Sequence, residues 1–561
     1  MRRFLLAFAA PAVLLAGCAT PAAEGPDLGA PVAADSAYGM FLAGAAALNE
    51  GRNSDAARFL ELARSESGDD PAVAERAFTA ALMAGDIQKA AALAPTGPAA
   101  SEPGKRLGRL AQVVAALAEG EGKAAQDALG DDGIGFPHRG AAALLGPWVA
   151  AAAGDENGAI VRPQLRGDGG VDYFGQIGQA HMFERARRYD EAETNFKALT
   201  GGEAPSELAV TAYGEFLERR GRRSEAVALY EAGLRRNPSS EALKQARARA
   251  AAKKKAPAAP TIHEGAAFAL LAPAATMISA RQDQIGQAYL RMALTLDPSR
   301  NDAWLMLGDL LQQKGDVEGA RQAYSKPKAG SPEFAAAQAK LAWSHQSVGD
   351  KEGALKLARA AAASGDREGR ITLSDLLRVN EQYEESIALL DELIAETQTP
   401  DWQLYYARGQ AKERLGRWDA AEVDLQKALE MRPDEPELLN YLGYGWIDRG
   451  ERLEEALGMI QKAVAANPRS GAIVDSLGWA YYRLGDHKKA VEILEQAVEL
   501  EAGDPEINNH LGDAYWMVGR KDEAVFQWRR VLTLKPDEKI RADAETKLAS
   551  GLGPTRKVAG P

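Results

Sequence analysis

Cysteine is nearly absent from this sequence: among 561 residues the only one is Cys18. A single thiol excludes a disulfide framework within the chain, and a chain of this length can rely on a packed apolar core instead. Zinc sites built from several thiolates are excluded for the same reason. Histidine is also scarce, and no two of the six lie three or four residues apart; they are His138, His181, His263, His345, His487 and His510. We therefore expect neither a metal site nor a cofactor.

Catalytic motifs are missing as well. The sequence has no Gly-x-Ser-x-Gly elbow, and its glycine-rich stretch at 166–170 lacks the lysine of a phosphate-binding loop. Internal repeats account for nearly every other segment, which leaves no room for a separate catalytic domain. The formal net charge of -12 also disfavours nucleic acid as a partner. We expect a protein that is not an enzyme.

Long apolar runs are confined to the N-terminus. The residues Met1-Arg2-Arg3 precede an apolar run from Phe4 to Ala16. That run is shorter than the roughly 20 residues of a membrane-spanning helix but has the length of a signal-peptide core. We identify no second apolar segment long enough to span a membrane, so we expect the rest of the chain to lie in an aqueous compartment.

The residues Leu15-Ala16-Gly17-Cys18 resemble the lipobox of bacterial lipoproteins. The resemblance implies a signal peptide over 1–17, a Cys18 that carries acyl chains such as palmitate, and firm anchoring by several chains. Ala19 stands where aspartate commonly retains such proteins in the inner membrane, so the resemblance implies the outer membrane, with the body facing the periplasm. The alternatives are a soluble exported protein or a buried free cysteine. Residues 18–36, rich in Ala, Pro, Gly and Asp, predict a flexible tether.

The remainder of the chain repeats itself. The segments 307–324, 442–460, 477–494 and 511–528 align, with glycines near their starts. Small residues recur at intervals that are mostly 34 or 35 residues, at Ala320, Ala354, Ser386, Ala421, Ala456, Ala490 and Ala524. Within one unit, Leu477, Gly478 and Tyr481 share a face of a first helix, and Ala490, Leu494 and Ala497 share a face of a second. Such pairs must stack to bury their apolar faces.

This pattern resembles the tetratricopeptide repeat (TPR) family, which implies an all-α fold, a TPR α-solenoid built as a superhelix of helix–turn–helix repeats. The spacing predicts two arms: a degenerate one over 37–240 and a clearer one over 267–538. Residues 241–266 are expected to form a linker or hinge, with Lys253-Lys254-Lys255 as a solvated run or, alternatively, a basic docking patch. Residues 539–561 are expected to form a capping helix and a disordered tail.

The binding surface of such a solenoid is predicted from positions beside the core. The fifth, ninth and twelfth positions of each first helix form one stripe, which in the TPR family lines the concave groove. Aromatics, amides and arginine on that stripe favour protein binding. The stripe predicts a protein-binding groove lined by Tyr406, Gln410, Asn440, Tyr444, Asp475, Trp479, Tyr482, Arg483, Asn509, Asp513 and Trp516.

An alternative stays open for the aromatic members of this stripe. Trp479, Tyr482 and Trp516 could instead pack against the next repeat or against a capping helix near 539–549. Four other aromatic residues fall on core positions, so we assign them to packing: Trp446, Tyr481, Tyr515 and Trp528.

A lipid-anchored solenoid without catalytic motifs is best interpreted as a scaffold or adaptor that holds periplasmic proteins near the outer membrane. The run 438–536 resembles the C-terminal TPRs of large proteobacterial lipoproteins. One known type in that group is the adaptor of a periplasmic carboxyl-terminal processing protease, which delivers peptidoglycan hydrolases for degradation. The resemblance implies such partners. The alternative is an assembly factor, pilotin-like or related to barrel assembly, for outer-membrane or secretion components.

Overall fold

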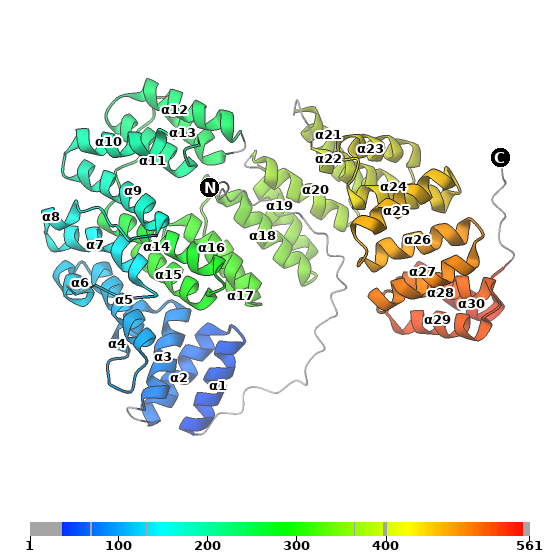
Figure 1. Ribbon diagram of the computed structural model, residues 1–561, viewed down its shortest axis with the longest axis horizontal. Helices are drawn as coiled ribbons and strands as arrows, with labels where there is room; N and C mark the ends of the chain where they lie inside the picture. Colours follow the sequence, from blue (N-terminus) through cyan, green and yellow to red (C-terminus); the bar gives the residue numbers. More distant parts are fainter. Residues whose placement is uncertain are drawn as a thin grey trace. The chain divides into compact units, whose positions relative to one another are not determined.

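The computed structural model describes residues 36–67, 70–130, 133–202, 204–238, 240–363, 365–396 and 401–553 (Figure 1). Within these ranges the chain forms α-helices joined by short turns and contains no strand. The predicted signal peptide, Cys18 and all but the last residue of the predicted tether lie outside the described residues. The all-helical fold predicted from the repeat pattern is confirmed.

The chain divides into two compact units, residues 1–337 and 338–561, and the boundary passes through α18 (Phe334–Ser347). The helices of unit 1 are α1 (Ala37–Asn49), α2 (Asn53–Ser67), α3 (Pro71–Ala84), α4 (Ile87–Ala92), α5 (Glu102–Ala118), α6 (Gly122–Leu129), α7 (Arg139–Ala153), α8 (Glu156–Ala159), α9 (Gly169–Arg185), α10 (Tyr189–Thr200), α11 (Glu207–Arg219), α12 (Arg223–Arg236), α13 (Glu241–Ala251), α14 (Ile262–Ser279), α15 (Asp283–Leu296), α16 (Asn301–Gln313) and α17 (Val317–Tyr324). Those of unit 2 are α19 (Lys351–Ala363), α20 (Arg367–Val379), α21 (Tyr383–Ala395), α22 (Trp402–Arg414), α23 (Trp418–Met431), α24 (Pro436–Arg449), α25 (Leu453–Ala466), α26 (Gly471–Arg483), α27 (His487–Leu500), α28 (Pro505–Met517), α29 (Lys521–Thr533) and α30 (Glu538–Ser550).

Consecutive helices pack as antiparallel pairs, and the small residues of the repeat mark where they touch. All seven of these residues, from Ala320 to Ala524, have no exposed surface. Glycine on the first helix also allows the two helices of a pair to approach closely. A Cβ at Gly478 would lie 2.5 Å from Cγ of the buried Leu494. Since a contact that short is not tolerated, the pair α26–α27 depends on glycine at this position.

Unit 1 departs from a simple array because α14 and α15 fold back onto the earlier helices. Helix α14 packs on α7 and α9, and α15 packs on α3, α4 and α5 (Figure 1). Buried polar contacts join the two layers: Nδ1 of His138 lies 2.7 Å from the hydroxyl of Tyr289, and Nε2 of Gln287 donates to the carbonyl of Met83 at 3.2 Å. The N-terminal helices therefore share one core with α14 and α15.

This packing corrects the predicted hinge at 241–266. Residues 241–251 form α13, which packs on α11 and α12, and residues 262–266 begin α14. Only 252–261 connect the two helices, and they do so inside unit 1. The sequence pattern places the boundary between the two arms too early in the chain. Helix α14 pairs with α15 as in a normal repeat, and its additional contacts with α7 and α9 are not visible in the repeat spacing.

Helix α14 is an exception to the expectation that no segment after the N-terminus is long and apolar enough to span a membrane. Among the described residues it is the one helix long and apolar enough to do so by length and composition. Its residues Ala266, Ala267, Leu270 and Ala274 have no exposed surface and pack in unit 1. We assign α14 to the core of unit 1.

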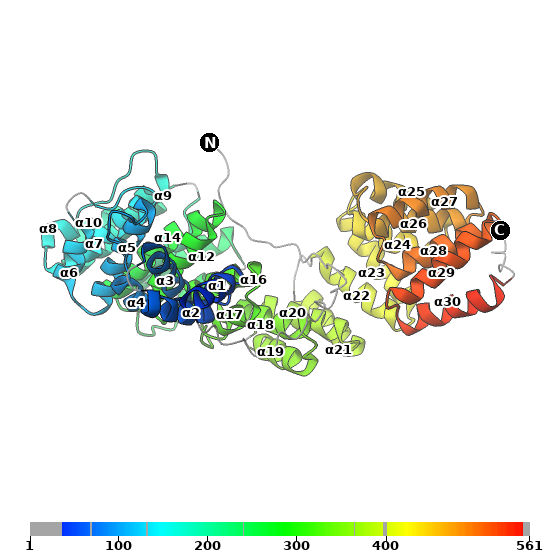
Figure 2. The same cartoon turned by 90° about the horizontal axis from the view of Figure 1, so that it is seen from below.

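At the C-terminal end of unit 2, α30 packs on α28 and α29 (Figure 2). This is where the sequence places a capping helix. Ala544, on the packed side of α30, has no exposed surface, and the Asp537 carboxylate accepts from the amide of Ile540 to cap the helix. Residues 554–561 of the predicted tail lie outside the described residues.

Candidate functional site

The residues predicted to line a groove all lie on α22, α24, α26 and α28, which are first helices of successive repeats in unit 2. We call the surface formed by these helices together with α20 and α30 the first-helix face. Side-chain contacts connect each of these helices to the next, for example Arg378 of α20 to Gln410 of α22 and Asp475 of α26 to His510 of α28. The prediction that these side chains share one face is therefore consistent with the structure.

The face is filled by its own side chains at α26 and α28. The indole of Trp479 stacks between two rings, with centroid distances of 4.6 Å to Tyr482 and 4.1 Å to His510. Nδ1 of the buried His510 lies 2.9 Å from the carboxylate of Asp475. Burial alone would lower the pKa of His510, but the adjacent carboxylate raises it to about 9. His510 is therefore a cation at neutral pH that is sandwiched against Trp479 and paired with Asp475.

The face is closed at α28 by the capping helix. Nζ of Lys547 donates to Asp513 at 2.8 Å and to the side-chain carbonyl of Asn509 at 3.1 Å, while Asn509 donates to Asp543 at 2.8 Å. Burial raises the pKa of Asp513 despite the Lys547 ammonium beside it. Trp516 packs against Trp528 at a centroid distance of 5.3 Å. This end of the face is a buried polar network.

These contacts correct four of the groove predictions. Asp475, Tyr482, Asn509 and Asp513 are buried and do not line an open surface, because the following first helix or α30 covers them. The alternative of packing against the next repeat is the observed one for Tyr482. Trp479 and Trp516 are half-buried in the same cluster, whereas Trp446, Tyr515 and Trp528 are buried as the core assignment predicts, and Tyr481 is half-buried in the packing.

The middle of the face has two hydrogen bonds between helices. The Tyr444 hydroxyl donates to Glu506 at 3.4 Å, and the Arg483 guanidinium donates to the backbone carbonyl of Asp448 at 2.8 Å. The side-chain oxygen of Asn440 and the indole nitrogen of Trp479 are buried and have no hydrogen-bond partner among the described residues. Asn440, Tyr444 and Arg483 are half-buried.

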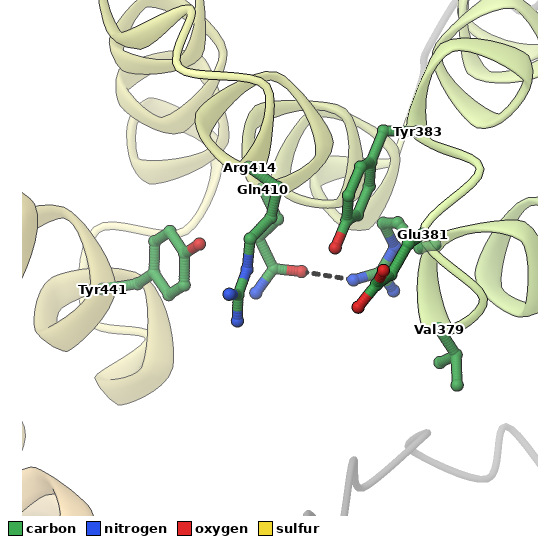
Figure 3. A pocket seen from close by; sticks show the side chains of 7 residues that line it. Val379, Glu381, Tyr383, Gln410, Arg414 and Tyr441 are labelled. Carbon is green, nitrogen blue, oxygen red and sulfur yellow. Dashed lines mark hydrogen bonds between the residues drawn. The ribbon is translucent and has the colours of Figure 1, made fainter. Parts of the chain in front are cut away.

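The open part of the first-helix face is a cavity of about 300 Å³ between α20, α22 and α24 (Figure 3). We call it the arginine pocket. It is lined by Arg378, Val379, Glu381, Tyr383, Gln410, Arg414 and Tyr441. Figure 3 shows Gln410 and Arg414 side by side on α22, with Tyr441 on one side of them and Tyr383 on the other. Of the residues predicted from sequence, Gln410 lines this pocket.

The polar groups of the arginine pocket are mostly donors, with the Glu381 carboxylate as the acidic group of its lining. Arg378 pairs with Asp375 at 2.9 Å and donates to the side-chain carbonyl of Gln410 at 2.7 Å, so its position is fixed. Arg414 forms no hydrogen bond or ion pair with any residue that the structure describes. The Tyr441 hydroxyl donates to Glu413 at 3.3 Å, and burial raises its pKa. Such a set is suited to carboxylates or backbone carbonyls.

Tyr406 supports the wall of the arginine pocket instead of lining it. Its ring meets Tyr441 edge to face at a centroid distance of 5.5 Å and Trp402 at 6.1 Å. Burial raises the pKa of its hydroxyl too. Sequence reasoning placed Tyr406 at the correct end of the face but could not distinguish wall from lining.

Sequence reasoning missed both arginines of the pocket, although a signal for them exists. The predicted stripe starts at Tyr406. Arg378 occupies the twelfth position of the preceding repeat, which the prediction did not include. Arg414 occupies the position after the twelfth, which is equivalent to that of Arg483, a residue that the prediction did include. Reading one repeat further back and keeping this extra position would have found both.

The described residues contain no cluster of three or more His, Cys, Asp or Glu side chains that could hold a metal ion. The first-helix face of unit 2 carries hydrogen-bonding groups, charges and aromatic rings, presented by stacked helix pairs. These features define an α-solenoid repeat protein.

Comparison with known proteins identifies the type of repeat. Two family models described as tetratricopeptide repeat match residues 266–536 and 207–250. These residues carry tetratricopeptide repeats, a repeat type that forms scaffolds for protein–protein interaction. The tetratricopeptide repeats expected from the sequence pattern are therefore confirmed over these residues.

One curated relative is the TPR repeat-containing protein PA4667 of Pseudomonas aeruginosa, 34% identical over 139 residues. The match covers 25% of this chain and 23% of that protein, so the chain spans about a quarter of the relative's length.

Solved structures with similar folds include the hetero-tetramer Cut9-Hcn1 of APC/C, 15% identical with a TM-score of 0.39 over 92% of this chain and 96% of that one. Another is TTC0263, a thermophilic TPR protein of Thermus thermophilus, 25% identical with a TM-score of 0.29 over 33% of this chain and 99% of that one.

Proposed function

We propose that this protein is a lipid-anchored periplasmic scaffold that binds a segment of a partner protein in the arginine pocket. The observation that carries the proposal is Arg414, a guanidinium at the pocket that makes no hydrogen bond or ion pair with the described residues. At the other end of the face, comparable polar positions are already occupied by intramolecular partners. An extended peptide segment can supply the carbonyl or carboxylate oxygens that Arg414 and Gln410 can bind.

The proposed anchor is Cys18, because the lipobox resemblance implies acylation there and places the body on the periplasmic side of the outer membrane. The proposed partners are a carboxyl-terminal processing protease and peptidoglycan hydrolases, as the resemblance to lipoprotein adaptors implies. Anchoring and binding would then act together, since holding two proteins on one scaffold raises their effective concentration.

The test is affinity purification from membranes, with co-purifying proteins identified by mass spectrometry. The tagged intact protein is compared with a Gln410→Ala/Arg414→Ala double variant. Arg469→Ala is the matched control, because it also removes an exposed guanidinium but lies in the turn before α26. We expect the protease and hydrolases with the intact protein and the control, and an at least tenfold loss with the double variant.

Equal capture by the double variant would contradict the assignment of the arginine pocket. A Cys18→Ala version tests the anchor, because it should leave the membrane fraction while keeping the same partners. Co-purification of β-barrel assembly or secretion components instead would favour the alternative function, an assembly factor.

A further inference from the structure

Unit 1 contains a second cavity, of about 250 Å³, in the place where α14 closes over α9 and α11. We call it the interlayer cavity. Its apolar walls include Trp148 of α7 and Phe268 of α14, and Trp148 has 3% of its surface exposed. Gly265 lies against the indole of Trp148, so that any Cβ at this position would clash with the ring. The wall is therefore built by close approach of α14 to α7.

Three polar atoms at the interlayer cavity are buried without a hydrogen-bond partner among the described residues. They are Nδ1 of His181, Oγ1 of Thr211 and Nε of Arg300. The nearest carboxylate oxygen to His181 Nδ1, from Glu184, is 3.9 Å away, which is too far for a hydrogen bond. Because native proteins pair nearly all buried polar atoms, these atoms indicate a polar occupant. Oγ1 of Thr211 and Nδ1 of His181 can accept a hydrogen bond from it, whereas Nε of Arg300 is a donor and does not contribute to binding a cation.

The charges around the interlayer cavity favour a positive occupant. Three carboxylates line it, from Glu215, Glu264 and Asp297, against the single guanidinium of Arg300. Arg300 is already engaged, with Asp302 at 3.0 Å and the ring of Phe268 at 5.2 Å.

Glu215 is the carboxylate with the weakest compensation. Glu264 accepts from the amide of Thr261 at 2.7 Å, and Asp297 accepts from the hydroxyl of Ser299 at 2.7 Å. Among the described residues, Glu215 has one ion pair, at 3.4 Å to Arg249, and burial raises its pKa. A cation in the cavity would form an ion pair with the Glu215 carboxylate and so compensate for its loss of hydration.

We propose that the interlayer cavity binds a small organic cation, an ammonium or guanidinium group on a short apolar body. The charged group pairs with Glu215 and bonds to the hydroxyl of Thr211, while the body lies against the rings of Trp148 and Phe268. Aromatic walls add cation–π attraction to the ion pair. The volume is below the range of drug-sized pockets, which limits the ligand to a simple amine. This site belongs to unit 1 and is independent of the arginine pocket.

The experiment titrates the full chain with phenethylamine by isothermal calorimetry at neutral pH. 2-Phenylethanol and 3-phenylpropionate are the matched neutral and anionic probes, because they keep the ring and change only the charged group. We expect saturable binding of the amine, and binding at least tenfold weaker for the alcohol and the acid. No binding of the amine, or equal binding of all three probes, would overturn the proposal.

Variants assign the site. Glu215→Gln should weaken amine binding about tenfold, and Thr211→Val, which keeps the side-chain shape, should weaken it a few-fold. Glu231→Gln is the control, since it removes a carboxylate that pairs with Arg247 on the exposed surface of the same unit. Circular dichroism confirms that each variant is folded. Unchanged affinity in both folded site variants would overturn the assignment to this cavity.

Discussion

The two ends of the first-helix face in unit 2 are built from the same repeat positions, yet one end holds a cavity and the other holds a packed polar network. Between α20 and α24, Arg414 lines a cavity of about 300 Å³ and has no hydrogen bond or ion pair to the described residues. Between α26 and α30, Asp475 is paired with His510, and Asp513 with Lys547. A position on a repeat thus becomes surface or core according to the residue that the next helix places opposite it.

The largest expected effect comes from breaking the network at its buried ion pair. Replacing Asp475 by alanine leaves a buried histidine cation without its carboxylate, which should cost about 3–5 kcal/mol in the free energy of unfolding. Urea titration followed by circular dichroism measures this loss. Asp434→Ala, in an exposed turn, is the control and should change little. Equal stability of the two variants would show that the Asp475–His510 ion pair does not stabilise the packing between α26 and α28.

The same pair predicts a pH dependence of smaller size. Because the pKa of His510 is raised from 6.5 to about 9 by folding, its contribution is complete below pH 6.5 and is lost as the pH rises through 9. The free energy of unfolding should fall over this window, by on the order of 3 kcal/mol at most. The difference between wild type and His510→Gln isolates this term from other titrations. A difference that stays constant from pH 6.5 to 9 would contradict the prediction.

The smallest effect is expected at the open end. Replacing Arg414 by glutamine removes no hydrogen bond or ion pair to the described residues, so the free energy of unfolding should change by less than about 0.5 kcal/mol. The same urea titration measures it. A loss as large as that of Asp475→Ala would mean that Arg414 is part of the packing, and the contrast between the two ends would disappear.

The helical repeats could be predicted from sequence because they depend on local spacing. A small residue is needed wherever two helices of a pair touch, and this requirement recurs at each unit, so that Ala490 and Ser386 mark the core equally well. The Ser386 hydroxyl donates to the backbone carbonyl of Ser374 at 2.9 Å, which lets serine replace alanine there.

The candidate site could be predicted only in part. The stripe positions find the correct face and Gln410. The buried Asp513, however, accepts from Trp528 of its own repeat and also pairs with Lys547, which lies on a helix outside the repeat. Nothing in the repeat that contains Asp513 encodes that partner. In the same way, the packing of α14 on α7 joins segments far apart in the chain, and repeat spacing carries no information about that contact.

The return of α14 and α15 onto the early helices has a consequence for how unit 1 folds. Repeats that touch only their neighbours can form one after another, with stabilities that nearly add. In unit 1, by contrast, hydrogen bonds connect residues 146, 151 and 204 positions apart in the sequence. Their loop-closure entropy must be overcome before the contacts form, which slows folding. A nascent chain that has reached only α13 therefore lacks part of the core of its own N-terminal helices.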